Sequence, residues 1–138
     1  MKAVSELNKQ KVRLFLDAVI NEGRLELIDE LLAADYVGRV PCAELAVRGR
    51  DELRHLMTAQ HLTHPHLYVK IDDEIAEDDL VVIRWRATRT TPATGASPGD
   101  LRTWSGMSLI RLLAGMQVDS YTALALGTYD TGGATLYV

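Results

Sequence analysis

The stretch LYVKIDDEIAEDDLVVIRWRATRTT, residues 67–91, decides the fold because it reads as two strands joined by an acidic turn. In its first half Leu67, Val69 and Ile71 alternate with Tyr, Lys and Asp, which is the period of two expected of a half-buried strand. Its second half is rich in Val, Ile, Trp and Thr, residues that favour strands. The Glu-Asp-Asp sequence at 77–79 favours a turn. The pattern therefore predicts an antiparallel hairpin.

More strands must accompany this hairpin, because an isolated pair of strands is at best marginally stable in water. Pro, Gly, Ser and Thr crowd residues 90–100, which predicts a loop. Beyond the loop we expect a strand over 101–113, a turn at 114–116 and a last strand over 117–126. The apolar face of such a sheet needs a covering layer.

The first half of the chain has the period of helices. Apolar residues recur at helical spacing over residues 3–21, and Gly23 is placed to end this helix in the left-handed conformation. A second helix is expected over 25–32, followed by a short extended piece that Pro41 ends. A third helix begins at 49–51. Helices followed by long antiparallel strands indicate an α+β domain with helices on one side of a curved sheet.

The composition is that of one ordinary globular domain of 138 residues, 47% of them hydrophobic and 25% charged. A formal net charge of −4 and scattered arginines argue against nucleic-acid binding. The polar residues that interrupt the start of the chain argue against a signal peptide or a membrane span. The single cysteine, Cys42, favours a reducing compartment and is interpreted as a small apolar filler. We therefore expect a soluble, cytoplasmic protein with no nucleic-acid or membrane partner.

Four phrases resemble the SnoaL-like polyketide cyclase family, which has the cone-shaped nuclear-transport-factor-two-like fold. They are LLAADYVGRVP at 31–41, VRGRDELRHLM at 47–57, HPHLYVKIDDEIAEDDLVVIRWRATRT at 64–90 and WSGMSLIRLLAG at 104–115. The resemblance implies N-terminal helices packed on a curved, mostly antiparallel sheet. It also implies a deep, mostly apolar pocket and a homodimer formed through the outer face of the sheet.

The resemblance places a single domain over residues 1–126 and leaves 127–138 as a C-terminal tail. Three glycines make this tail a poor candidate for regular structure. We expect it to be loose or to lie over a neighbouring molecule.

The chemistry that the resemblance implies is the aldol closure of a polyketide without metal or cofactor, in which an aspartate moves the proton beside a histidine. Thr91 stands where the histidine is expected and Ser108 where the carboxylate is expected. A hydroxyl is too weak an acid and base to shuttle a proton near neutral pH. The usual cyclase machinery is therefore predicted to be absent.

Two related enzyme classes fail the same comparison. Ketosteroid isomerases need a tyrosine, a base and a protonated acid at the positions that here hold Phe15, Val40 and Ser108. Limonene epoxide hydrolases need an arginine and two aspartates at the positions that here hold Arg86, Thr88 and Ala123. Neither chemistry is expected of this chain.

Seven residues are expected to contact a small apolar ligand: Phe15, Arg39, Arg86, Trp104, Ser108, Asp119 and Tyr121. Trp104 is expected as a wall and shares a strand face with Ser108. Arg39 lies either at the pocket mouth or on the surface. Asp119, with Tyr121 beside it as donor and as a second wall, is either a desolvated base in the pocket or an exposed residue after a turn.

The orientation of Arg86 has two readings. Strand alternation puts Arg84 and Arg86 on one face and Val81, Ile83, Trp85 and Ala87 on the other. By the resemblance to epoxide hydrolases the arginine face looks into the pocket, where a guanidinium would hold an anionic or carbonyl-bearing ligand. Alternatively, the arginines lie on the outer sheet and pair with Asp72, Glu74 or Asp119.

The histidines of QHLTHPH, at positions 61, 64 and 66, are candidate metal ligands. Their spacing matches no standard zinc pattern. We interpret the segment as a surface connection between helix and strand, and we expect no metal site.

Three functions stay open from the sequence. The first is a SnoaL-like enzyme without cofactor, a cyclase or isomerase for an apolar, carbonyl-bearing and polyketide-like compound, with altered acid and base groups. The second is a non-catalytic carrier of a small hydrophobic ligand. The third is a dimerising domain with a filled core. The loss of the familiar proton-transfer residues counts against the enzyme and favours the carrier.

Overall fold

The computed structural model describes residues 3–91, 95, 99–125 and 137–138. Its first half contains α1 (Val4–Leu14), a π-helical continuation (Phe15–Asn21), a 3-10 turn (Leu25–Leu27), α2 (Ile28–Leu31), β1 (Leu32–Val40), a second 3-10 turn (Pro41–Ala43), β2 (Leu45–Arg48) and α3 (Gly49–Thr63). Its second half contains β3 (Leu67–Glu77), β4 (Leu80–Thr91), β5 (Asp100–Leu113) and β6 (Met116–Leu124). The predicted order of elements is confirmed apart from β2, a strand that the sequence analysis does not predict.

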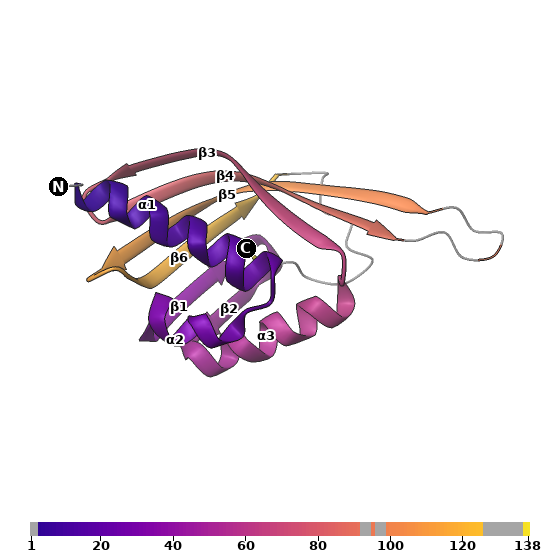
Figure 1. Ribbon diagram of the computed structural model, residues 1–138, viewed down its shortest axis with the longest axis horizontal. Helices are drawn as coiled ribbons and strands as arrows, with labels where there is room; N and C mark the ends of the chain where they lie inside the picture. The colour runs from indigo at the N-terminus through magenta and orange to yellow at the C-terminus, as the bar shows by residue number, and fades with distance from the viewer. Residues whose placement is uncertain (1–2, 92–94, 96–98, 126–136) are drawn as a thin grey trace.

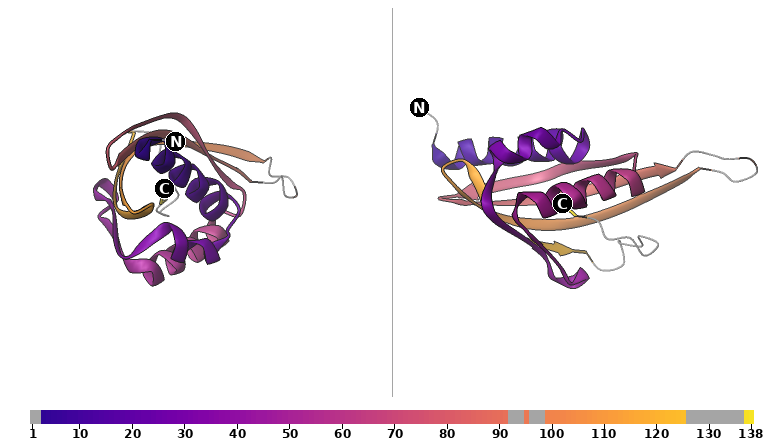
Figure 2. Two further views of the ribbon diagram at one scale, coloured as in Figure 1. Left: turned by 60° about the vertical axis from the view of Figure 1, so that its left-hand side comes forward. Right: turned by 90° about the horizontal axis from the view of Figure 1, so that it is seen from below.

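The strands of the described chain form one sheet in the order β2-β1-β6-β5-β4-β3. β1 and β6 run parallel, and the other neighbours are antiparallel. Figure 1 shows α1 crossing the sheet, with α2 and α3 beside β1 and β2. Seen from another direction (Figure 2, left), the sheet curls around an interior that α1 and α3 close. The α+β prediction, with helices packed on a curved sheet, is confirmed.

The hairpin of residues 67–91 forms as predicted. β3 and β4 pair from Leu67 opposite Arg89 to Glu77 opposite Leu80. Asp78 in the turn takes a left-handed φ of 54°, a conformation that Asp tolerates better than most residues. The acidic residues therefore form the turn for the reason that the sequence indicates.

A bulge in β3 breaks the alternation that the sequence shows. It lies between Ile71 and Asp73 and shifts the faces of the strand by one residue. Beyond it Ile75 faces solvent, with 66% of its surface exposed. Glu74 turns inward instead, with one carboxylate oxygen 3.4 Å from Arg13. Burial raises the pKa of Glu74 more than the nearby charge of Arg13 lowers it.

The core lies between the concave face of the sheet and the helices. Its inward residues on β4 are Val81, Ile83, Trp85 and Ala87, all fully buried. Gly106 on β5 makes room for one of them, because a Cβ there would lie 2.6 Å from the Trp85 ring. The indole can therefore pack flat against the neighbouring strand.

The end of the first helix is fixed to β3 by a reciprocal pair of hydrogen bonds. The Asn21 side chain donates to the carbonyl of Val69 at 2.9 Å and accepts from its N–H at 2.7 Å. Gly23 then takes a left-handed φ of 73°, as predicted for the residue that ends this helix. This junction holds the helix over the concave face.

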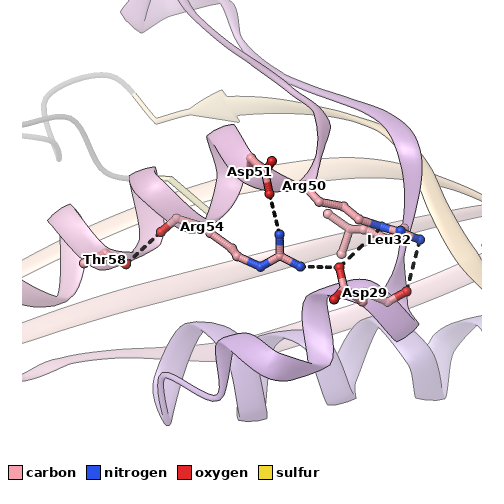
Figure 3. Close-up of polar contacts among 6 residues, drawn as sticks. All are labelled: Asp29, Leu32, Arg50, Asp51, Arg54 and Thr58. Carbon is pink, nitrogen blue, oxygen red and sulfur yellow. Dashed lines mark hydrogen bonds and ion pairs between the residues drawn. The ribbon is translucent and has the colours of Figure 1, made fainter.

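A charged cluster joins α2, β1 and α3 on the surface (Figure 3). Arg50 donates to the carbonyls of Leu32 at 2.9 Å and Asp29 at 3.1 Å. Arg54 pairs with the carboxylates of Asp29 and Asp51. Since these groups satisfy one another, the cluster serves to hold α3 against the sheet rim.

Cys42 is exposed, so its interpretation as a small apolar filler is wrong. It lies in the 3-10 turn that joins β1 to β2.

In the part of the chain that the structure describes, no helix has the length and apolar character needed to cross a membrane.

Candidate functional site

The interior of the cone contains a small set of buried polar side chains among large apolar ones. Gln60 and His64 come from the end of α3, Ser108 from β5, and Ser120 and Thr122 from β6. Buried polar groups are costly unless they find hydrogen-bond partners. The hydrogen-bond partners of these side chains therefore determine which groups remain available to bind a ligand.

One chain of hydrogen bonds crosses the concave face from β4 to β6. The Trp85 indole N–H donates to Ser108 Oγ at 3.1 Å, and Ser108 lies 2.7 Å from the Thr122 hydroxyl. Thr122 donates onward to the carbonyl of Val138 at 3.0 Å. Trp85, Ser108 and Thr122 are therefore satisfied within the protein.

A second polar group surrounds the phenol of Tyr137. Its hydroxyl contacts that of Tyr36, and both hydroxyls lie near Ser120 Oγ, at 2.7 Å from Tyr36 and 3.3 Å from Tyr137. Burial raises the pKa of Tyr36 and of Tyr137, so both phenols stay protonated at neutral pH. The group consists of neutral hydroxyls that can each donate and accept.

Gln60 holds the backbone of Tyr137. Its side-chain amide donates to the Tyr137 carbonyl at 2.9 Å and accepts from the Tyr137 N–H at 2.7 Å. Tyr137 and Val138 are 1% and 5% exposed, and the C label lies inside the ring of elements in Figure 2. The prediction that the tail is loose or lies over a neighbour is wrong for these two residues, because their polar groups find partners inside the cone. Residues 127–136 of the predicted tail lie outside the described residues.

A third group, made of His64, Arg89 and Trp104, is less well satisfied. Arg89 donates to His64 Nδ1 at 2.8 Å and lies over the Trp104 ring, 5.7 Å from its centre. The His64 and Trp104 rings meet edge to face at 5.9 Å. We call these three residues the donor cluster.

Each member of the donor cluster has a buried nitrogen that lacks a hydrogen-bond partner among the described residues. These atoms are His64 Nε2, Arg89 Nε and Trp104 Nε1. Because Arg89 donates to Nδ1, neutral His64 carries its proton on Nε2. All three atoms are then N–H donors, and each would be satisfied by an acceptor oxygen within hydrogen-bond distance.

His64 is neutral in this environment. Burial lowers its pKa, and the nearby charge of Arg89 lowers it further. A neutral imidazole with a free Nε2–H can polarise a carbonyl, but it takes up a proton poorly. The donor cluster therefore fits the binding of an oxygen better than the removal of a proton.

Three of the seven predicted site residues lie in the interior. Phe15 is 3% exposed and packs in the core from the π-helical segment. Trp104 and Ser108 point inward from β5, and each is 1% exposed. Their inward orientation agrees with the expected strand face.

The other four predicted site residues lie on the outer surface, because the outer faces of β1, β4 and β6 carry them. Arg39 and Tyr121 are exposed and oppose one another in the register of β1 and β6. Asp119 is half-exposed, 3.7 Å from the guanidinium of Arg111. The interior position considered for Tyr121 and Asp119 is therefore wrong, the surface alternative holds for Arg39, and any role in ligand binding from outside the cone stays a prediction.

The orientation proposed for the arginines of β4 is likewise wrong. Arg86 makes two hydrogen bonds to Asp72, at 2.7 and 2.9 Å, and Arg84 one to Asp73 at 2.6 Å, all on the exposed face. The hydrogen bond from Arg86 lowers the pKa of Asp72. The alternative, an outer face with ion pairs, is confirmed for Arg86 with Asp72.

Sequence reasoning missed the donor cluster, although one signal was present. Trp85 and Ala87 point inward on β4. The same alternation predicts that Arg89, two residues further along the strand, also points inward. The interpretation as a surface connection is wrong for His64, which is 1% exposed because the end of α3 packs against the sheet. Of the neighbouring histidines, His61 bonds the Ile20 carbonyl at 2.9 Å and His66 is exposed. The three histidines thus have separate surroundings.

Comparison with known proteins identifies the fold. The family model for the SnoaL-like domain matches residues 12–119. A protein from Jannaschia sp. CCS1, provisionally assigned as a SnoaL-like polyketide cyclase, is similar with a TM-score of 0.75 and 19% identity over 91% of this chain and 90% of that one. A search of curated proteins finds no match to this sequence.

Two further solved structures show the same architecture. IdmH from Streptomyces antibioticus, provisionally assigned as a polyketide cyclase, matches with a TM-score of 0.71 and 22% identity over 88% of this chain and 94% of that one. An LEH-like epoxide hydrolase from M. tuberculosis matches with a TM-score of 0.73 and 15% identity over 93% and 85%. At such identities the similarity shows the fold alone.

Proposed function

The chain belongs to the SnoaL-like domain family, and we propose that it is a cofactor-independent cyclase or isomerase for an apolar, carbonyl-bearing, polyketide-like compound that binds in the interior of the cone. Structural neighbours assigned as polyketide cyclases support the compound class. The observation that carries the proposal is the donor cluster. Its three N–H groups lack partners among the described residues, whereas the neighbouring polar groups of the interior bond one another.

The donor cluster fits a carbonyl oxygen on chemical grounds. A carbonyl accepts two hydrogen bonds and carries no hydrogen that would repel the three donors. Arg89 adds a positive charge that favours negative charge on that oxygen. Trp104 offers an indole N–H beside a large apolar surface, which suits an aromatic or polyene skeleton.

The reaction follows from the same arrangement. When a carbon beside the carbonyl gives a proton to a water molecule, negative charge develops on the oxygen, and preorganised N–H donors stabilise that charge more than the neutral ground state. A carbon flanked by two carbonyls loses its proton most readily, which suits a site whose fully buried described residues include no Asp or Glu. The enolate can then attack a second carbonyl, whose oxygen takes the proton back from water as the carbon–carbon bond forms, or it can take that proton at another carbon.

A second candidate function is a carrier that binds the same compound without turnover. It is favoured by the absence of Asp and Glu from the fully buried residues of the described chain, and by the pairing of the inward carboxylate, Glu74, with Arg13. Neutral His64 is a donor here, so it does not replace the missing base. Carrier and enzyme share the binding site and differ in whether the compound changes.

The deciding experiment is native mass spectrometry of gently purified protein, followed by identification of any adduct after denaturation. The adduct is then offered to the wild type, Trp104→Phe and His64→Gln. An enzyme loses turnover in both variants with folding intact, whereas a carrier loses affinity alone. A wild-type adduct without any carbonyl group contradicts both candidates.

We also propose that two copies pair through the outer face of the sheet, as the family resemblance implies. Exposed apolar side chains support this on β5 and β6, where Met107, Leu109 and Tyr121 are between 41% and 52% exposed. Ile75 on β3 adds to the exposed apolar side chains of the outer face.

We also keep a cytoplasmic location as part of the proposal, because the exposed thiol of Cys42 is compatible with a reducing compartment.

A further inference from the structure

Tyr137 and Val138 occupy a seat in the interior that is built for the groups they present. Its polar parts come from β1, α3 and β6: Tyr36 and Ser120 surround the phenol, Gln60 holds the backbone, and Thr122 binds the Val138 carbonyl. These lining residues are all buried, at 5% exposure or less. The seat therefore has a defined shape and a defined hydrogen-bond pattern.

Gly38 on β1 shows how closely the seat fits a phenol. A Cβ at this position would overlap the hydroxyl oxygen of Tyr137 and that of Tyr36. Gly38 lies in the middle of a strand, where glycine is normally unfavourable. Its place is explained by the room that it leaves for a hydroxyl group.

An empty seat would leave several polar groups without partners. The Gln60 amide would lose one donor bond and one acceptor bond, and Thr122 would lose the carbonyl to which it donates. Buried groups left in this way favour any occupant that restores the bonds. The bonds of the phenol to Ser120 and of Thr122 to a carbonyl call for an occupant with a phenol at one end and a carbonyl group at the other.

We propose that this seat is a binding site for a phenolic compound that carries a carbonyl group, and that such a ligand enters by displacing Tyr137 and Val138. These two residues act as an internal competitor. The association constant measured for the full chain equals that of the open seat multiplied by the fraction of molecules whose seat is free. The inference narrows the compound class of the proposed function and adds a means of control.

The test compares the full chain with a chain that ends at residue 136. Both are titrated by calorimetry with 4-hydroxyacetophenone and with N-acetyl-tyrosyl-valine amide, which reproduces the groups of Tyr137 and Val138. The shortened chain is expected to bind both compounds at least about tenfold more tightly than the full chain. Acetophenone and N-acetyl-phenylalanyl-valine amide, which lack the phenol hydroxyl, are expected to bind more weakly.

Two variants complete the test. Gly38→Ala in the shortened chain adds a methyl group where the phenol hydroxyl belongs, and it is expected to weaken both phenols but neither of the compounds that lack the hydroxyl. If the shortened chain does not fold, Tyr137→Gly in the full chain opens the same seat and is titrated in the same way. Tyr68→Gly, at an exposed position of β3, is the matched control.

Three results would overturn the inference. They are equal binding by the full and the opened chain, no binding by a folded opened chain, and binding of the peptide without binding of 4-hydroxyacetophenone. The hydrogen bonds of Tyr137 and Val138 given above involve no member of the donor cluster. A carbonyl adduct that depends on Trp104 would therefore support the proposed function even if this seat bound no phenol.

Discussion

The two faces of the sheet carry their polar side chains in opposite situations. On the outer face Arg84 and Arg86 pair with neighbouring aspartates in contact with solvent. On the inner face the donor cluster of His64, Arg89 and Trp104 holds three buried N–H groups without partners among the described residues. The outer face has more charge, but the inner face has the unmet bonding capacity. Unsatisfied buried groups therefore indicate a site better than charge density does.

The largest expected effect is on the inner face, at Ser108. Replacing Ser108 by Val leaves the Trp85 indole N–H without its acceptor and breaks the bond to Thr122. We expect a loss of about 2–4 kcal/mol in the free energy of unfolding, since each orphaned group costs about 1–3 kcal/mol. Urea denaturation measures it. Thr103→Val, at an exposed position of the same strand, is the control, and equal losses for the two variants would remove the contrast between the faces.

The second prediction concerns pH and His64. Its pKa is lowered in the folded chain, so below the ordinary value of about 6.5 the unfolded chain binds the proton first. Stability should fall as the pH falls through this region, by at most about 1.4 kcal/mol per pH unit, until folded His64 is protonated too.

His64→Gln tests this pH dependence, because it removes the titrating group. The variant should lose this part of the pH dependence in unfolding experiments between pH 7 and 4. His66→Gln, at an exposed position, should retain it. Identical pH profiles for the wild type and His64→Gln would show that His64 is not buried as described.

The third prediction concerns the apolar part of the outer face. Leu109→Asp places a charge in the proposed pairing surface and should weaken the dimer at least about tenfold, which corresponds to about 1.4 kcal/mol. Analytical ultracentrifugation across a dilution series measures the association. Leu62→Asp, at an exposed position on α3, should leave the association unchanged. A wild type that is monomeric at every concentration contradicts the pairing.

The smallest effect is expected at Arg86. Its pair with Asp72 lies at the surface, where ion pairs contribute about 0–1 kcal/mol and are weakened by salt. Arg86→Ala should therefore leave the midpoint of urea denaturation and the ligand affinity almost unchanged. A large loss of affinity would return Arg86 to the list of ligand contacts.

The fold could be predicted because its determinants are local or periodic. The acidic turn after Glu77 and the alternation of β4 are readable directly. The order of helices and strands then leaves few arrangements. The bulge at Asp72 was not readable, because an extra residue in one strand is recognised only against its partner.

The site was predictable only in part. Trp104 and Ser108 followed from strand alternation once β5 was placed. The burial of His64 and Tyr137 depends on contacts between residues far apart in the chain, such as the bonds between Gln60 and Tyr137. No pattern within either segment indicates these contacts.

The two tryptophans of the chain provide the most direct measurement of the central claim, that the donor cluster binds a carbonyl oxygen. In a nitrogen-15 NMR titration with acetophenone, which lacks the hydroxyl that the seat of Tyr137 binds, each indole N–H gives its own resonance. The Trp104 signal should move downfield as its free N–H finds an acceptor, while the Trp85 signal, already bonded to Ser108, should hardly move. A Trp104 signal that stays in place while other resonances report binding would contradict the claim.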